Sequence, residues 1–423
     1  MPKIVSAQEA IKALEPGFTV FIGESCGEPQ TLVEALIADK ERLKGTRLLD
    51  SRRIAGSRYA FLYDYFKTVC FQLAPDTYKL AHTGKIEFLP LKMSEIHRLF
   101  SSGVLPIDVA LVQVAPPDDG GNCSFGVSVG YTLDAALNAK LVIAEVNELM
   151  PRTPGSSLPL DRFDYVVKTS RPLLEYNSPD IREQRIAVAQ NVVKLISDGD
   201  TLSIGIGGVP EAVMRSLRGK RDLGVHSGLI TDEIVAPIEA GIITNKRKQI
   251  DKDKTISAQA MGTKKLFRFL HENPAVEMRP YSYTHDLRVM AQLDNFVVVN
   301  SALEVDLTGQ VNSESIGAVE FSGVGGQADF IRGAALSCGG KAIIALTSTT
   351  RGGKVSRIVS HFGAGTAVTT PRYDVQYIVT EYGIAELWGK TLSERAEALI
   401  SIAHPDFRDR LKREWQEHRT ISQ

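Results

Sequence analysis

The sequence predicts an α/β protein made of two related halves, each with a parallel sheet and covering helices. Two observations support this prediction. Short apolar segments alternate with helix-like stretches along the chain, an order typical of parallel strands joined by right-handed crossovers. In addition, residues 11–29 resemble residues 193–210, and an internal duplication of one α/β unit is the simplest explanation.

Each copy of the repeat reads as a helix, a glycine turn, a short apolar strand, a glycine-bearing loop and a helix opened by proline. Proline suits a first helical turn, where its missing N–H costs nothing. A chance match over so short a window is the alternative. With one single-residue slip in the loop, the corresponding pairs are Lys12/Lys194, Gly17/Gly199, Thr19/Thr201, Ile22/Ile204, Gly23/Gly205 and Pro29/Pro210.

The remaining strands are expected where apolar runs resemble strands that are buried on both faces of a sheet. The repeat places a boundary near residues 185–195, which divides the chain into a domain of residues 1–188 and a domain of residues 189–423. The expected strands are residues 108–114 and 141–146 in the first half, and 296–300, 342–346 and 375–380 in the second, with a helix at 392–402.

Bulk composition excludes several classes of partner. A net charge of −1 gives no overall attraction to a polyanion, so we expect no nucleic-acid partner. The densest charge run, residues 246–254, mixes both signs and therefore favours a solvated loop. No apolar run approaches the ~20 residues needed to cross a membrane.

The cysteines indicate a reduced, cytoplasmic protein without a metal site. Cys26, Cys70, Cys123 and Cys338 are scattered and lack the paired spacing of metal ligands or a disulfide framework. Residues 1–9 lack the long apolar core of a signal peptide.

A glycine-bearing loop in the second repeat copy is a candidate ligand-binding loop. Gly205, Ile206, Gly207, Gly208 and Val209 join an expected strand to an expected helix. Glycines allow a ligand to approach backbone N–H groups, and a helix N-terminus adds partial positive charge. The loop is not a dinucleotide fingerprint, because proline occupies the third glycine position, and it is not a P-loop. A tight packing turn is an equal alternative.

A second glycine loop is more distinctive. It consists of Gly323, Val324, Gly325, Gly326 and Gln327, and a carboxylate and an arginine follow within ten residues. The alternative is a glycine bend in which those two charged side chains, Asp329 and Arg332, pair at a helix start.

Glu381 is a candidate active-site carboxylate. It follows the expected strand 375–380, and open α/β sheets bind their ligands just beyond the carboxyl ends of the strands. A solvated glutamate that caps a helix is the alternative.

Together, the ordered motifs resemble the acetyl-CoA hydrolase/transferase family of class I CoA-transferases, which includes 4-hydroxybutyrate CoA-transferases. The resemblance spans nearly the whole chain. It implies two open α/β domains of the CoA-transferase type with the active site in the cleft between them. The matching segments are residues 113–118, 126–129, 144–147, 150–153, 205–211, 258–266, 305–311, 323–334, 379–383 and 403–408.

The resemblance also implies the ligands and the roles of several residues. Coenzyme A is expected as a cosubstrate near the loop 205–209, with the acyl end near the loop 323–327. Asn300 matches a polar residue beside the thioester site, and Glu381 matches a second carboxylate. No permanently bound cofactor is expected. The protein is expected to form a homodimer or a higher homo-oligomer.

One position departs from the family. Gly228 lies in the stretch 224–232, where the family usually has the glutamate that carries CoA as a thioester. Glycine cannot carry CoA, and it leaves a space beside the thioester carbonyl for water or part of a substrate. Pro237 is a further departure, expected to interrupt the following helix and shift the local backbone.

Three hypotheses follow for the function. The first is an acyl-CoA enzyme that transfers the acyl group to water or another acceptor without a covalent intermediate at residue 228. The second is a CoA-transferase that uses another carboxylate or a ternary complex, and the third is a catalytically silent acyl-CoA-binding protein. Glu381 is the best candidate for a general base, whereas Ser227 with His226, or Glu28, are weaker substitutes for the nucleophile.

Overall fold

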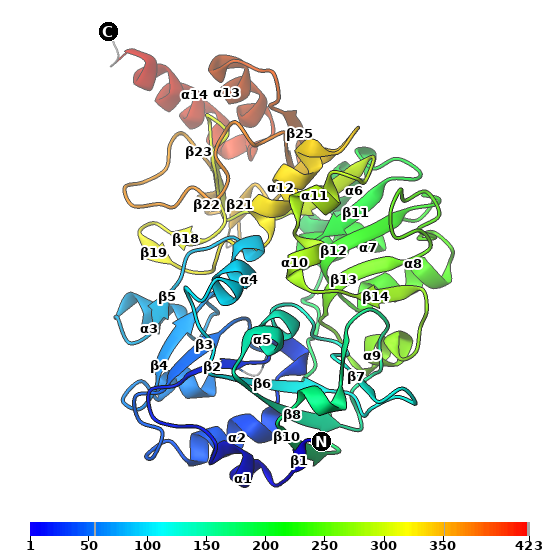
Figure 1. Cartoon of the computed structure of the whole chain (residues 1–423). Helices are drawn as coiled ribbons and strands as arrows, with labels where there is room; N and C mark the ends of the chain where they lie inside the picture. The colour runs from blue at the N-terminus through cyan, green and yellow to red at the C-terminus, as the bar shows by residue number, and fades with distance from the viewer. Residues whose placement is uncertain (55, 351, 421–423) are drawn as a thin grey trace.

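The computed structural model describes residues 1–54, 56–350 and 352–420. It confirms an α/β protein with two large parallel sheets, one from each half of the chain (Figure 1). In that view the N-terminal half lies below, in blue and cyan, and the C-terminal half above it, in green to red. All the strands expected from apolar runs are present, and the helix expected at 392–402 is α13 (Leu392–Ser401).

Both large sheets have eight strands in the described part of the chain. The order in the first sheet is β1 (Lys3–Ile4), β10 (Tyr165–Thr169), β8 (Leu141–Asn147), β6 (Val109–Val114), β2 (Thr19–Ile22), β3 (Arg47–Asp50), β4 (Lys67–Cys70) and β5 (Glu87–Phe88). The order in the second is β14 (Val276–Met278), β13 (Thr255–Ala260), β12 (Gly224–Ile230), β11 (Thr201–Ile204), β15 (Phe296–Asn300), β20 (Lys341–Ala345), β24 (Tyr377–Thr380) and β25 (Gly383–Glu386). Only the β24–β25 pairing among them is antiparallel.

The strand orders extend the duplication well beyond the sequence repeat. The order β10-β8-β6-β2-β3-β4-β5 in the first sheet corresponds strand by strand to β24-β20-β15-β11-β12-β13-β14 in the second. The register agrees as well, because Thr19 pairs with Arg47 of β3 and the equivalent Thr201 pairs with Gly224 of β12. The two halves are therefore copies of one fold, with β2 equivalent to β11 and β3 equivalent to β12.

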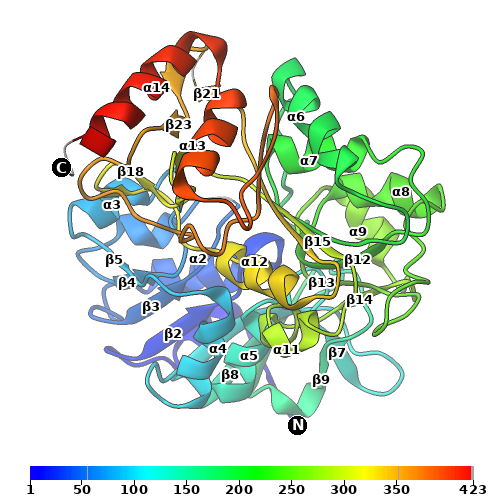
Figure 2. The ribbon, with the colours of Figure 1, turned by 90° about the horizontal axis from the view of Figure 1, so that it is seen from above.

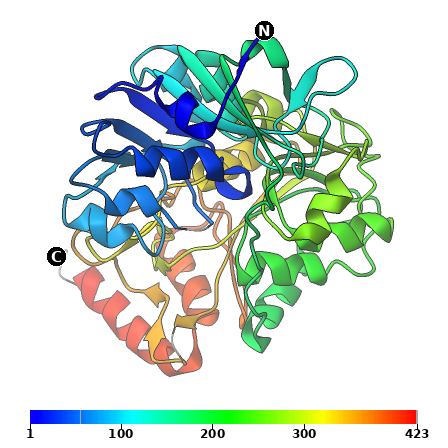
Figure 3. The same ribbon diagram turned by 90° about the horizontal axis from the view of Figure 1, so that it is seen from below.

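Helices cover both faces of the first sheet. The helices α1 (Ala7–Ile11) and α2 (Gln30–Ala38) pack against one face, which Figure 3 shows from below, and α4 (Met93–Ser101) and α5 (Thr132–Asn138) pack against the other. The period of two in a strand explains this, since neighbouring residues of β2 enter different clusters.

The second sheet is covered in the same way. One face carries α6 (Glu183–Lys194) and α7 (Gly208–Arg215), and the other carries α11 (Leu287–Met290) and α12 (Gln327–Leu336), which crosses the centre of Figure 2. The helix α6 contacts β20, β24 and β25. The predicted boundary after residue 188 therefore falls inside a helix that packs on the second sheet.

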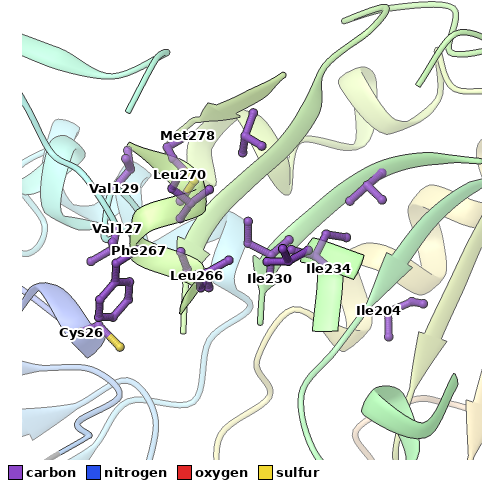
Figure 4. Packing of buried hydrophobic residues seen from close by; sticks show 14 of the residues in the cluster. Cys26, Val127, Val129, Ile204, Ile230, Ile234, Leu266, Phe267, Leu270 and Met278 are labelled. Atoms are coloured by element: carbon purple, nitrogen blue, oxygen red, sulfur yellow. The ribbon is translucent and has the colours of Figure 1, made fainter. Parts of the chain in front are cut away.

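The two halves share one hydrophobic cluster (Figure 4). Cys26, Val127 and Val129 of the first half are fully buried in it together with residues of α9 (Lys264–Leu270) in the second. The backbone adds to this junction, because the N–H of Ala260 donates to the carbonyl of Val127 at 2.8 Å. The relative position of the halves is thus fixed by a common core.

Smaller elements complete the described chain, and none of its helices combines the length and apolar character needed to cross a membrane. The remaining helices are α3 (Tyr78–His82), α8 (Val235–Glu239), α10 (Tyr281–Thr284) and α14 (Pro405–Thr420). The remaining strands are β7 (Asn122–Ser124), β9 (Ser157–Pro159), β16 (Glu304–Asp306), β17 (Val311–Asn312), β18 (Ser315–Ile316), β19 (Val319–Glu320), β21 (Thr349–Thr350), β22 (Val355–Ser356) and β23 (Ile358–Val359).

Candidate active site

A cavity of about 260 Å³ lies where residues of the two halves meet. In the second half, Gly205 directly follows β11, Gly228 lies within β12, and Asn300 ends β15. These positions share one edge of the sheet because neighbouring parallel strands end on the same side. The first half contributes Ser25, Arg52, Gln72 and Met93 to the wall.

Most of the site residues predicted from the sequence line this cavity. They are Gly205, Ile206, Gly228, Asn300, Gly323, Val324, Gly325, Gly326 and Gln327. Gly207, Gly208 and Val209 do not line it, and their expected role in binding CoA stays a prediction. Gly207 is the N-cap of α7, Arg185 lies against Gly208, and Val209 is buried in the shared core.

The space beside Gly228 is filled by His285. A β-carbon on residue 228 would lie 2.7 Å from Cε1 and 3.0 Å from Nε2 of the imidazole. The ring is held by edge-on contacts with Tyr281 and Phe330, with centroid separations of 4.8 and 4.6 Å. The imidazole thus occupies the position that a side chain at residue 228 would need, while Gly228 itself borders the open cavity.

Burial determines the charge of this imidazole. Its Nδ1 lies 2.9 Å from the Thr284 hydroxyl, which also lies 3.3 Å from the carbonyl of Pro280. The ring hydrogen can be on either nitrogen, because the hydroxyl can donate to Nδ1 or accept from it. Burial, together with nearby His226, lowers the pKa of His285 to about 3. The ring that lines the cavity is thus neutral at neutral pH.

Ser227 and His226 do not form a dyad, as expected for sequence neighbours in a strand. The Nε2 of His226 lies 3.0 Å from the carbonyl oxygen of Thr284, whereas the Ser227 hydroxyl donates to the carbonyl of Ile204 at 3.3 Å. Burial lowers the pKa of His226 to about 4, with a further contribution from Lys248. The serine hydroxyl therefore has no base beside it.

Among the described lining residues there is no aspartate or glutamate, and the charged side chain is Arg52. Glu28 lies outside the cavity, where its carboxylate faces Arg53 at 3.6 Å and Arg58 at 3.4 Å. The cavity wall thus offers no carboxylate that could replace a glutamate at position 228.

Two carboxylates near the predicted site are also held outside the cavity. Glu381 accepts hydrogen bonds from the backbone N–H and the hydroxyl of Ser348, both at 2.8 Å, and it does not line the cavity. Asp329 accepts the Ser94 hydroxyl at 2.6 Å, and Arg332 donates to Asp374 at 3.0 Å, so Asp329 and Arg332 do not pair with each other.

The backbone around Gly228 is regular. The β12–β13 ladder pairs Ser227 with Ser257 and Leu229 with Gln259 on either side of it. Pro237 lies in the first turn of α8 and does not interrupt it, because N–H groups there lack an intrahelical partner in any case. The expected break in the following helix is therefore wrong.

Comparison with known proteins now identifies the family. Residues 1–175 match the acetyl-CoA hydrolase/transferase N-terminal domain, and residues 262–415 match the C-terminal domain. A 4-hydroxybutyrate coenzyme A transferase from Clostridium kluyveri is 45% identical over 417 residues, which cover 98% of this chain and 97% of that relative. The chain belongs to the acetyl-CoA hydrolase/transferase family.

Solved structures agree with this assignment. RipA from Yersinia pestis has a TM-score of 0.93 at 31% identity, with 99% of this chain and 98% of that chain covered. A 4-hydroxybutyrate CoA-transferase from Porphyromonas gingivalis has a TM-score of 0.82 at 34% identity, with 98% of both chains covered. This member of the acetyl-CoA hydrolase/transferase family is thus an enzyme of the acyl-CoA transferase/hydrolase type.

Proposed function

We propose that this protein binds an acyl-CoA in the cavity and transfers the acyl group directly to water or another small acceptor. No glutamyl-CoA thioester forms at residue 228 in this proposal. One observation carries it: Gly228 presents no nucleophile, His285 occupies the adjacent space, and the described lining residues include no carboxylate.

The proposed step is a direct attack on the thioester. An oxygen of water or of the acceptor bonds to the acyl carbon, the C–S bond of the tetrahedral intermediate breaks, and the departing sulfur receives the proton that the attacking group loses. Backbone N–H groups of the loop 323–327 are suited to stabilise the oxyanion, an effect worth ~3 kcal/mol per donor elsewhere. The loop that begins at Gly205 is proposed to bind CoA.

His285 has a supporting role in this proposal. In the tautomer whose hydrogen is on Nδ1, its Nε2 can accept a hydrogen bond from the attacking water or hydroxyl group. A group with a pKa of about 3 is a poor proton acceptor at neutral pH, so the imidazole orients the attacking group rather than deprotonating it.

A CoA-transferase that works through a ternary complex is the second candidate, favoured by the 45% identity to a 4-hydroxybutyrate coenzyme A transferase. Here a bound carboxylate would attack the thioester carbonyl and release CoA thiolate, which gives a mixed anhydride. The thiolate would then attack the acceptor's own carbonyl, the anhydride C–O bond would break, and the original acyl group would leave as a carboxylate. We further propose that the protein is cytoplasmic, forms a homodimer or higher homo-oligomer and has no permanently bound cofactor. Light scattering of the purified protein would test the oligomeric state.

Mass spectrometry and product analysis together test these proposals. The protein is incubated with several acyl-CoAs, with and without acetate, and free CoA, new acyl-CoA and protein mass are followed. Direct transfer predicts released CoA without an adduct on the protein, and an adduct of CoA mass contradicts it. New acyl-CoA formed only with acetate supports the ternary complex, whereas binding without turnover supports a catalytically silent protein.

A further inference from the structure

Arg52 is a charged group that the proposed chemistry does not use. It lines the cavity described above and also an adjoining cavity of about 470 Å³, with Met261 and Ser322 common to both walls. Its Nε donates to Oε1 of Gln72 at 3.4 Å. In the described part of the chain, no carboxylate oxygen lies within 4.0 Å of this guanidinium.

Neighbouring arginines are paired differently. Arg53 contacts Asp50 at 2.5 Å, and Arg58 contacts Glu28 at 3.4 Å. Glu175, which lines the adjoining cavity, accepts instead from the backbone N–H of Lys264 at 3.3 Å. Arg52 is therefore a guanidinium with five donors whose single protein hydrogen bond is long, in a place where a ligand can reach it.

An unpaired charge of this kind lowers the free energy of unfolding of the protein. Taking a cation out of water is unfavourable unless a partner charge and hydrogen bonds offset the loss. Arg52 is half-buried, and this desolvation lowers its pKa. Glu24, a carboxylate whose charge acts on it, is itself engaged by the backbone N–H of Tyr131 at 2.8 Å.

Ser25 gives a second, independent observation at the same place. It lines the cavity and has a φ of +56°, a left-handed conformation that costs a non-glycine residue about 1–3 kcal/mol. Its backbone N–H donates to the carbonyl of Arg52 at 3.0 Å. The strained turn therefore brings a hydroxyl and the guanidinium to the same wall.

The duplicated fold explains why these residues face the reaction centre. Counting from the paired Thr19 and Thr201, Ser25 lies in the loop after β2 that is equivalent to the loop 205–209 after β11. Counting from Arg47 and Gly224, Arg52 is equivalent to Leu229, the residue after Gly228. Arg52 thus lies just after β3 and Leu229 near the end of the equivalent strand β12, and both line one cavity.

We propose that Arg52, the Ser25 hydroxyl and the Gln72 amide form a subsite for a carboxylate of the bound substrate. The acyl group is then that of a dicarboxylic acid, joined to CoA through one end and held by Arg52 through the other. This inference rests on the proposed acyl-CoA binding, but not on any particular reaction. A carboxylate on the acceptor has the same chemistry, and the experiment separates the two.

Binding of two CoA thioethers matched in length tests the subsite without any turnover. S-(3-carboxypropyl)-CoA ends in a carboxylate and S-butyl-CoA in a methyl group, and neither can transfer an acyl group. Calorimetry measures both, together with CoA and free succinate, on the full chain and on Arg52→Gln and Arg52→Lys. Arg98→Gln, which removes an exposed arginine outside the cavity, is the matched control.

Arg52→Gln is expected to weaken the binding of S-(3-carboxypropyl)-CoA by about 10- to 100-fold, which is the range for the loss of a charge-assisted hydrogen bond. Binding of S-butyl-CoA and CoA should stay unchanged, and Arg52→Lys should recover part of the loss. If only free succinate depends on Arg52, the subsite holds the acceptor's carboxylate. The proposal is overturned if Arg52→Gln weakens the binding of all CoA ligands equally, or if it weakens the binding of no ligand that carries a carboxylate.

Thermal unfolding of the same variants distinguishes binding from a structural role. Because Arg52 has no partner charge, Arg52→Gln should leave the melting temperature unchanged or raise it. A large fall in melting temperature with unaltered ligand selectivity would make Arg52 a structural residue and overturn the subsite. If the protein does not transfer acyl groups, the proposed reaction fails, but these binding results still test the subsite.

Discussion

The Cε1 atom of His285 lies 2.7 Å from the point where a β-carbon of residue 228 would be. Non-bonded carbon atoms do not approach so closely, so the side chains allowed at positions 228 and 285 depend on each other. A glutamate at position 228 would therefore require the His285 ring to move.

Gly228→Ala should destabilise the protein by about 1–3 kcal/mol, the usual cost of overpacking a buried site. Gly205→Ala is the matched control, because its β-carbon would have no atom closer than 3.9 Å in the same cavity wall. Denaturant unfolding of both variants checks this. Equal stabilities of the two alanine variants would show that His285 moves aside freely.

Gly228→Glu alone should not give a covalent CoA adduct, because the imidazole blocks the space that the carboxylate needs. The double variant Gly228→Glu/His285→Ala opens that space and should form an adduct of CoA mass with acyl-CoA, seen by intact-protein mass spectrometry. His285→Ala alone is the control and should remain free of adduct. An adduct on Gly228→Glu alone would contradict the coupling of the two positions.

His285 should also make stability depend on pH. The pKa of the imidazole is about 3 in the folded protein, against an ordinary value of 6.5. Between these values the unfolded chain binds more protons, so the free energy of unfolding falls as pH decreases below about 6.5. Between pH 7.5 and 5 the free energy of unfolding of the wild type should fall by ~2 kcal/mol more than that of His285→Asn. Parallel pH profiles in denaturant titrations would contradict the assignment.

Glu381→Gln tests the general base that the sequence suggests. A general base typically accelerates a reaction about 10²- to 10⁴-fold. Ligand binding can also shorten catalytic hydrogen bonds that are long in the free enzyme. Since Ser348 binds both carboxylate oxygens outside the cavity, we expect the variant to keep the acyl-transfer rate within about tenfold. A loss above about 100-fold, absent from Ser348→Ala, would identify Glu381 as the base.

The sequence predicts the α/β class and the duplication correctly. Most of the glycine-loop residues that it selects line the cavity, and their role in binding CoA stays a prediction. Apolar runs such as 296–300 identify buried strands because both of their faces are covered. The glycine loops are recognisable because they follow or precede such strands. Val209 lies away from the cavity, since the helix has already begun there and its side chain is buried in the core.

His285 and Arg52 could not be found from motifs. His285 reaches position 228 only through the packing of α10 against β12, across more than fifty residues of sequence. Arg52 carried a weak signal, because extending the repeat from β2 and β11 to the next strand aligns it with Leu229. That extension needs a strand register, which the short repeat in the sequence does not provide.

The hydrophobic cluster shared by the two halves has a consequence for how the enzyme unfolds and admits its substrate. Neither half can separate without exposing Val127, Val129 and their partners in α9, so the chain should melt in one cooperative transition. Hinge opening between the halves would carry the same penalty. Entry and exit of the long CoA molecule should then depend on loop movements at the rim of the cavity rather than on separation of the halves.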